Sequence, residues 1–127
     1  MLKMEKVHED DRGEIYVITG LEKDVVINTT KKGYARGGCY HEQNDEHFVV
    51  IKGMVRLYVD GHEEVYHPGM NEYIPKGAPH MMKALTDCVT MEWGSTREEK
   101  GTYYAPYRDW VEKTNKERKD GIQNQTG

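Results

Sequence analysis

The residues most able to do chemistry are concentrated between Gly38 and Gly53. Within eight residues this stretch presents a thiol, an imidazole and a carboxylate, carried by Cys39, His41 and Glu46. All three groups bind metal ions. Cys39 and His41 are two residues apart, so in an extended strand their side chains project from the same face, as two ligands of one ion must. The stretch therefore predicts part of a metal site.

A second imidazole follows a turn that is rich in proline and glycine. Pro75 and Gly77 precede His80, which is therefore expected to open a strand. From that position the ring can complete the metal site from across a barrel. His47 directly follows Glu46 in the same expected strand, so its side chain is predicted to point to the opposite face.

The elements that would position these groups are short strands. Between about Glu14 and Trp93, short apolar or alternating segments are separated by Gly, Pro, Asp and Asn, which is typical of an all-β sandwich or barrel. The dipeptides Lys52-Gly53 and Asp60-Gly61 predict two consecutive antiparallel hairpins, the second with a type I′ turn. The predicted strands are Glu14–Thr19, Val25–Thr29, Tyr34–His41, Phe48–Ile51, Val55–Val59, Glu63–Tyr66, Glu72–Ile74, His80–Ala84 and Val89–Trp93.

The end of the sequence has a different pattern. Pro106 can open a helix, and Tyr107, Trp110 and Val111 then share one helical face. From Asn115 onward the residues are polar and unpatterned, which predicts fraying or disorder. We therefore expect a barrel with a short C-terminal helix over residues 1–114 and a flexible tail over residues 115–127.

Length and composition exclude several classes of function. The chain of 127 residues suits one domain, and its net charge of −4 gives no basis for binding nucleic acid. Its apolar runs are too short to cross a membrane, and the first residues lack the pattern of a secretory signal, so a cytoplasmic protein is expected. Two cysteines without a disulfide-rich spacing are expected to be thiols.

Two segments of the chain resemble the paired motifs of the cupin superfamily, G-x5-H-x-H-x3-4-E-x6-G and G-x5-P-x-G-x2-H-x3-N. In the first motif Cys39 replaces the first histidine, and in the second Ala84 replaces the final asparagine. The positions that match are Gly33, His41, Glu46, Gly53, Gly69, Pro75, Gly77 and His80. The resemblance implies an all-β fold, the cupin-type double-stranded β-helix or jelly-roll barrel.

The resemblance also assigns His41, Glu46 and His80 as metal ligands, with Cys39 open to two interpretations. As a thiolate, Cys39 would add a fourth ligand and favour a closed, structural site for Zn²⁺ or another thiophilic ion. As a thiol, it would leave two histidines and a carboxylate with open positions. That arrangement suits a non-haem iron oxygenase or a metal that polarises a carbonyl. The ion could be Zn, Fe, Mn or Ni.

A shorter resemblance concerns the run RGGCYH followed by EHFVVIKG. It is similar to the pattern of cupins that isomerise or epimerise nucleotide-linked deoxyketosugars, which implies a catalytic role for His41 as the base. An imidazole suits that role because its pKa lies near neutrality. The side chains that could contact phosphate, hydroxyls or a ring are Arg36, Tyr34, Tyr40, Tyr58 and Tyr73.

Three functions remain open at this point. The leading hypothesis is a metal-binding enzyme that acts on a sugar or nucleotide-sugar carbonyl by proton transfer. A non-haem iron dioxygenase and a non-catalytic carbohydrate- or ligand-binding protein are the alternatives. The resemblance to cupins, together with the need to cover edge strands, also predicts a homodimer with a small-molecule substrate.

Overall fold

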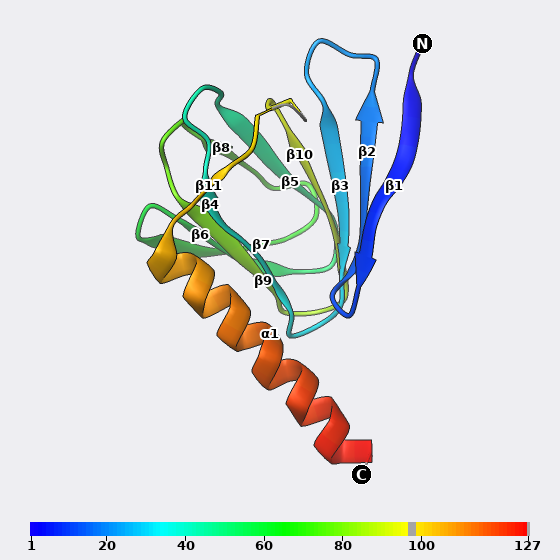
Figure 1. Cartoon of the computed structure of the whole chain (residues 1–127), viewed down its shortest axis with the longest axis vertical. Helices are drawn as coiled ribbons and strands as arrows, with labels where there is room; N and C mark the ends of the chain where they lie inside the picture. Colours follow the sequence, from blue (N-terminus) through cyan, green and yellow to red (C-terminus); the bar gives the residue numbers. More distant parts are fainter. Residues whose placement is uncertain (97–98, 127) are drawn as a thin grey trace.

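A computed structural model describes residues 1–96 and 99–126 as two antiparallel sheets and one C-terminal helix (Figure 1). The elements are β1 (Lys3–Asp10), β2 (Gly13–Thr19), β3 (Val25–Thr30), β4 (Ala35–Tyr40), β5 (Glu46–Lys52), β6 (Val55–Val59), β7 (His62–Tyr66), β8 (Asn71–Ile74), β9 (His80–Ala84), β10 (Cys88–Trp93), β11 (Thr102–Tyr103) and α1 (Ala105–Thr126). None of the helical segments described has the length and apolar character needed to cross a bilayer.

The two sheets enclose an apolar core. One sheet has the strand order β1-β2-β3-β10-β5-β8, and the other has the order β11-β4-β9-β6-β7. Alternation along each strand sends one set of side chains inward, among them Phe48 and Val50 from the first sheet and Leu57 and Met82 from the second. The predicted all-β jelly-roll class with a C-terminal helix is confirmed.

The turn at Asp60 and Gly61 has the geometry that its sequence predicts. Both residues have positive φ, 47° and 87°, and Val59 pairs with His62 across the hairpin of β6 and β7. Asp tolerates this left-handed conformation and Gly adopts it without steric cost, so the pair sets the type I′ turn.

The hairpin predicted at Lys52-Gly53 is wrong. The turn is tight, and Gly53 has a φ of 82°, but β5 pairs with β8 and β10 whereas β6 pairs with β7 and β9. The chain therefore crosses from one sheet to the other at this point. A side chain at Gly53 would collide with the backbone of Asp87, because its Cβ would lie 2.3 Å from that carbonyl oxygen.

Two strands were not predicted. β1 pairs with β2 at the edge of the larger sheet, but almost all of its side chains are exposed, so it carries no burial pattern. β11 has two residues and pairs Thr102 with Tyr40 and Tyr103 with Cys39. It brings the segment after β10 back to the strand that carries Cys39.

The helix α1 is longer than expected and continues past Asn115 to Thr126. Val111 is fully buried against the smaller sheet, and the ring of Trp110 lies 5.3 Å from that of Tyr58. The Asn115 amide accepts a hydrogen bond from Ala35 N (2.7 Å) and donates one to Ala35 O (3.0 Å). These bonds anchor the polar part of the helix to β4, which the pattern of the sequence does not reveal.

Candidate metal centre

Three of the four predicted ligands, Cys39, His41 and His80, lie together, and Glu46 lies beside the two histidines. Cys39 lies near the end of β4, His41 directly follows that strand, and His80 opens β9. Cys39 pairs with His80 in the register of β4 and β9, after an irregularity between Gly37 and Cys39. Glu46 opens β5 in the opposite sheet. The site therefore joins the two layers.

The distances between the side chains suit a single ion. The ligand atoms of Cys39, His41 and His80 all lie within 4.8 Å of one another. Oε1 of Glu46 lies 3.0 Å from Nε2 of His41 and 3.6 Å from Nε2 of His80. Nitrogen and oxygen ligands about 2.0 to 2.2 Å from an ion would be roughly 3.0 to 3.5 Å apart, so both histidines and the carboxylate match this spacing.

Hydrogen bonds outside the cluster orient two of the ligands. Nδ1 of His80 donates to the carbonyl of Ala78 at 3.1 Å, which leaves the lone pair of Nε2 directed at the cluster. Ser95 Oγ donates to Oε2 of Glu46 at 3.1 Å, so Oε1 is the oxygen turned toward the histidines. Metal ligands are commonly held by such outer contacts.

A buried oxygen atom supports the same assignment. Oε1 of Glu46 is buried and has no hydrogen-bond partner among the described residues, although His41 Nε2 is only 3.0 Å away. The two atoms are close without the alignment of a hydrogen bond. Two ligands that face a common ion have this relationship, and a buried carboxylate oxygen without a hydrogen bond would be costly. The residues therefore fit a bound cation.

The charges in the cluster are coupled. The Glu46 carboxylate raises the pKa of His41, whereas burial lowers the pKa of His80. Burial alone would raise the pKa of Glu46, but the contact with His41 outweighs it and lowers the pKa. Metal binding requires an ionised Glu46 and a neutral His80, as found here, whereas His41 must release the proton that its raised pKa favours.

Cys39 differs from the other three residues. Burial raises the pKa of its thiol to about 11, with the charges of Glu92 and Glu46 adding to the effect. Gly101 lies against it, since a Cβ at Gly101 would be 3.0 Å from the sulfur and 3.4 Å from Cε1 of His41. Without an ion, Cys39 is thus a protonated thiol under the segment that leads into β11.

A cavity of about 200 Å³ adjoins the cluster inside the barrel. Its walls include Cys39, His41 and His80, apolar side chains such as Phe48 and Leu57, and several polar side chains. The polar ones are Arg12, Asn28, Arg36 and Glu92. The cluster therefore opens into a space that combines apolar walls with hydrogen-bonding groups, which is typical of small-molecule sites.

Arg36 is the buried donor of this cavity. Its Nε donates to Thr30 Oγ1 at 2.8 Å and its Nη2 to the carbonyl of Thr29 at 2.9 Å. The third nitrogen, Nη1, is buried without a hydrogen-bond partner among the described residues. Burial lowers the pKa of Arg36 to about 10, so the guanidinium remains charged at neutral pH. Two hydrogen bonds thus hold the Arg36 side chain rigidly, and its Nη1 is available as a donor.

Glu92 on β10 is the acidic group of the cavity. Burial, followed by the negative charge of Glu46, raises its pKa to about 7. A carboxyl group with such a pKa can both release and accept a proton near neutral pH. Asn28, which is buried on β3, lines the same cavity.

The predicted substrate-binding tyrosines lie away from the cavity. Tyr58 packs against Trp110 under α1, and Tyr73 is 48% exposed on the outer face of β8. Tyr40 follows Cys39 and belongs to the opposite side of β4. Among the residues predicted to bind substrate, it is Arg36 that lines the cavity. His47 faces outward as predicted, and its ring contacts those of Tyr73 and Trp93.

Ser95 and Glu92 were not identified from the sequence. The alternation along β10 carries a signal for Glu92, because Cys88 and Thr90 are buried and Glu92 shares their face. A carboxylate on the inward side of a strand indicates a cavity or a site. For Ser95 no comparable signal exists, since its bond to Glu46 joins residues far apart in the sequence.

A jelly-roll of two antiparallel sheets, with a cluster of two histidines and a thiol beside a carboxylate and a cavity, defines a class of small β-barrel domains. Within that class the chain belongs to the cupin family, because the profile described as "Cupin domain" matches residues 29–94. A comparison with curated protein sequences gives no match.

Solved structures agree with this assignment. KdgF from Halomonas sp. aligns with a TM-score of 0.65 at 18% identity, over 75% of this chain and 86% of that one. An oxalate decarboxylase aligns with a TM-score of 0.66 at 20% identity, over 78% of this chain and 30% of the other. At these identities the likeness shows the fold alone.

A further match is to the capsular polysaccharide assembling protein CapF from Staphylococcus aureus. The TM-score is 0.64 at 26% identity, over 82% of this chain and 32% of CapF. The chain thus spans about a third of the length of CapF, and it matches one part of a larger protein.

Proposed function

We propose that the protein is a metal-dependent enzyme that moves a proton on a small sugar or nucleotide-sugar carbonyl compound, as an isomerase or epimerase does. The observation that carries the proposal is the continuity of the ligand cluster with a cavity that holds both Arg36 and Glu92. His41, Glu46 and His80 would hold a divalent ion, with Cys39 as a further ligand. The ion is Zn, Fe, Mn or Ni.

Each cavity residue has a defined role in this proposal. A bound ion would supply polarisation of a carbonyl oxygen. Nη1 of Arg36 and the amide of Asn28 donate hydrogen bonds to substrate oxygens, because both side chains are buried in the cavity wall. Glu92 exchanges the proton on the adjacent carbon. His41 is the alternative base, but its Nε2 is directed at Glu46, so metal binding and proton transfer would compete for one nitrogen.

The size and charge of the cavity limit the substrate. About 200 Å³ is below the roughly 300 to 1,000 Å³ of pockets for drug-sized ligands, so a single sugar-sized fragment is the part that enters. The walls present the hydrogen-bonding groups of Arg36, Asn28 and Glu92, which favours a substrate group with hydroxyls and a carbonyl. Any nucleotide would remain outside the barrel. The likeness to CapF, which is named for capsular polysaccharide assembly, supports a carbohydrate substrate.

One observation favours a second candidate, a non-haem iron dioxygenase. Burial raises the pKa of Cys39 to about 11, and a thiol that stayed protonated would leave two histidines and one carboxylate with open positions. A cupin that binds carbohydrate without turnover is the third candidate. We also infer a cytoplasmic protein that binds no nucleic acid and acts as a homodimer.

Metal analysis is the first test. Protein purified without chelator or nickel resin is expected to contain about one divalent ion per chain, and His80→Ala is expected to contain far less. Absence of an ion from both preparations, even after addition of Zn²⁺, Fe²⁺, Mn²⁺ and Ni²⁺, would exclude the metal site.

Isotope exchange then separates the candidates. With a panel of keto sugars and deoxyketosugar nucleotides in D₂O, solvent deuterium should enter one substrate. The variant Glu92→Gln should abolish this exchange and retain the ion, whereas His41→Ala should lose both. Substrate-dependent oxygen uptake with bound iron would instead identify a dioxygenase, and binding without turnover across the panel would identify a carbohydrate-binding protein.

A further inference from the structure

The pairing of β3 with its neighbours shows which end of the sandwich holds the metal cluster. The register joins Val25 of β3 to Trp93 of β10, and Trp93 to His47 of β5. His47 directly follows the predicted ligand Glu46, so the cluster lies at the Val25 end. The opposite end of β3 is Thr30, and about 16 Å of strand separates the two ends.

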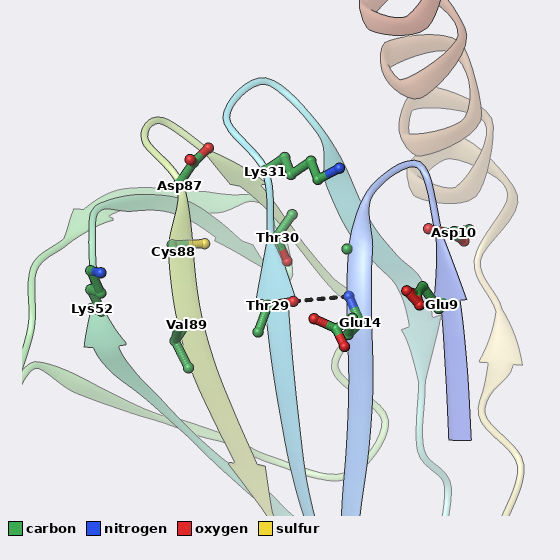
Figure 2. Close-up of a pocket in the computed structure, with 11 residues that line it drawn as sticks. Glu9, Asp10, Glu14, Thr29, Thr30, Lys31, Lys52, Asp87, Cys88 and Val89 are labelled. Carbon is green, nitrogen blue, oxygen red and sulfur yellow. Dashed lines mark hydrogen bonds between the residues drawn. The ribbon is translucent and has the colours of Figure 1, made fainter. Parts of the chain in front are cut away.

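Arg36 reaches the Thr30 end of β3 from the other sheet. Its Nε and Nη2 bind Thr30 Oγ1 and the Thr29 carbonyl, and Figure 2 shows both threonines near the end of β3. Arg36 is only 6% exposed, and no acceptor for its Nη1 lies among residues 1–96 and 99–126. Because a buried charged donor without an acceptor is costly, an oxygen atom of a ligand would be favoured at this nitrogen.

A second guanidinium, that of Arg12, lines the same cavity from the turn between β1 and β2. Its Nε and Nη2 donate to the Asp10 carboxylate at 2.7 to 3.2 Å, which leaves Nη1 out of that pair. The Arg12 carbonyl accepts a bond of 2.8 Å from Lys31 N, so the turn is fixed against the end of β3. After burial, the charge of Arg12 is the next influence that lowers the pKa of Arg36, so the two guanidiniums lie near each other.

The charges at this end of the cavity leave a positive excess. Asp10 compensates one of the two guanidiniums. Glu92, the acidic group of the cavity, pairs with Val26, which lies four residues from Thr30 and therefore about 13 Å along the strand. Its charge thus belongs to the cluster end. A single excess positive charge suits a monoanion better than a dianion.

We propose that Arg12 and Arg36 form a subsite for a carboxylate group, at the end of the cavity opposite the metal cluster. A guanidinium suits a carboxylate because its N–H donors lie in one plane, and such charge-assisted hydrogen bonds are about twice as strong as neutral ones. The ligand of the barrel is then a small sugar acid, with its carbonyl or hydroxyls toward Glu92 and the cluster. The sugar and its reaction rest on the proposed function, whereas carboxylate binding requires neither turnover nor an ion.

The dimensions of the barrel fit a ligand of about six carbons. In the smaller sheet Arg36 pairs with Met82 and Cys39 with His80, so their backbones are about 7 Å apart along β9. A six-carbon chain extends about 6 Å, and contacts at its ends add about 3 Å to a donor and about 2 Å to an ion. The total of about 11 Å lies between this 7 Å and the length of β3.

Matched pairs of acidic and neutral sugars test the subsite. The probes are D-glucuronate against D-glucose and D-galacturonate against D-galactose, titrated into the protein with and without added Zn²⁺ and followed by calorimetry. At least one acid is expected to bind about tenfold more tightly than its neutral partner. Because the arginines bind the carboxylate, this preference should persist without the ion.

Variants of the two arginines locate the preference. Arg12→Gln and Arg36→Gln should each reduce the preference for the acid by about tenfold. Arg12→Gln, in the turn, keeps the test decisive if the buried Arg36→Gln does not fold, and it should bind Zn²⁺ and the neutral sugar as the wild type does. Arg56→Gln is the matched control, because Arg56 lies on β6 beside Glu63 and does not line the cavity, and it should retain the preference.

The outcomes separate the subsite from the proposed function. Equal binding of acid and neutral sugar in both pairs, absence of binding included, would overturn the subsite, as would an unchanged preference in Arg12→Gln. Tighter binding of glucose-6-phosphate than of glucuronate would overturn the carboxylate assignment. Deuterium exchange into a neutral keto sugar without any preference for acids would leave the proposed function standing alone. A preference for acids without exchange into any substrate would leave the subsite standing alone.

Discussion

Ser95 Oγ donates a hydrogen bond of 3.1 Å to Oε2 of Glu46, joining the segment after β10 to the first residue of β5. This bond turns the other carboxylate oxygen toward His41 and His80, at 3.0 Å and 3.6 Å from their Nε2 atoms. The position of one hydroxyl group thus determines which carboxylate oxygen is available to an ion.

Replacement of Ser95 should therefore weaken metal binding. We expect Ser95→Ala to lower the affinity for Zn²⁺ by about 10- to 100-fold, the range found for lost outer contacts of metal ligands. Competition with a chromophoric chelator measures this change. Thr96→Ala is the control and should bind as the wild type does. An unchanged affinity in Ser95→Ala would show that Glu46 needs no support or is not a ligand.

The thiol of Cys39 should react slowly when no ion is bound. Burial raises its pKa to about 11, so the thiolate fraction at pH 7 is small and grows about tenfold with each pH unit up to that value. Alkylation by iodoacetamide, followed by mass spectrometry of the metal-free protein, should show this slope between pH 7 and pH 10. The Cys39→Ser variant separates the signal from Cys88, whose pKa burial also raises to about 11.

A bound ion then distinguishes the two interpretations of Cys39. If the sulfur is a ligand, addition of Zn²⁺ should release protons and block alkylation at every pH in this range. If the thiol is not a ligand, the pH profile with Zn²⁺ should follow that of the metal-free protein. The same experiment on Cys88 provides an internal reference, because Cys88 lies in the core and away from the cluster.

The polar part of α1 should contribute to stability through Asn115. Its amide pairs with both backbone groups of Ala35, at 2.7 Å and 3.0 Å. Removal of a partner from such partly buried groups costs about 1 to 3 kcal/mol, so Asn115→Ala should lower the free energy of unfolding by this amount. Urea denaturation measures the change. Lys116→Ala, at an exposed position of the same helix, should have little effect.

The β1–β2 turn should be sensitive to acid through Asp10. Partial burial raises the pKa of Asp10, but hydrogen bonds from Arg12 and His8 outweigh this effect and hold the pKa below its usual value. A lowered pKa in the folded state means that the stabilisation is present above about pH 4 and is lost as the pH falls further. Asp10→Asn should thus cost roughly 1 kcal/mol at pH 7 and progressively less below pH 4. Urea denaturation at several pH values tests this, and an equal loss at every pH would contradict it.

Much of the fold followed from local patterns. Nine of the strands lie where alternation and turn residues predict them, and Asp60-Gly61 forms the predicted turn because positive φ is a local property of those residues. His41, Glu46 and His80 were also predicted from the sequence as a set, and the structure places them close together. Their spacing from glycine and proline residues indicates where strands begin and end. Strand ends depend on a few neighbouring residues, so a local pattern can predict them.

Other features depended on which strands pair, and local patterns do not contain that information. Lys52-Gly53 looked like a hairpin because a tight turn has the same residues whether the chain stays in one sheet or crosses to the other. Strand register determines where the tyrosines expected around a substrate lie. It places Tyr58 under α1 and Tyr73 on the outer face of β8. A shift of one residue reverses every such assignment.

By itself, the sequence determined a cupin barrel and the types of group that could bind an ion. Only the tertiary structure decided that Ser95 orients Glu46 and that Glu92 and Arg36 share a cavity with the cluster. These relationships join residues that are distant in the chain. They arise from pairing and packing across two sheets, whose energies depend on all the strands together.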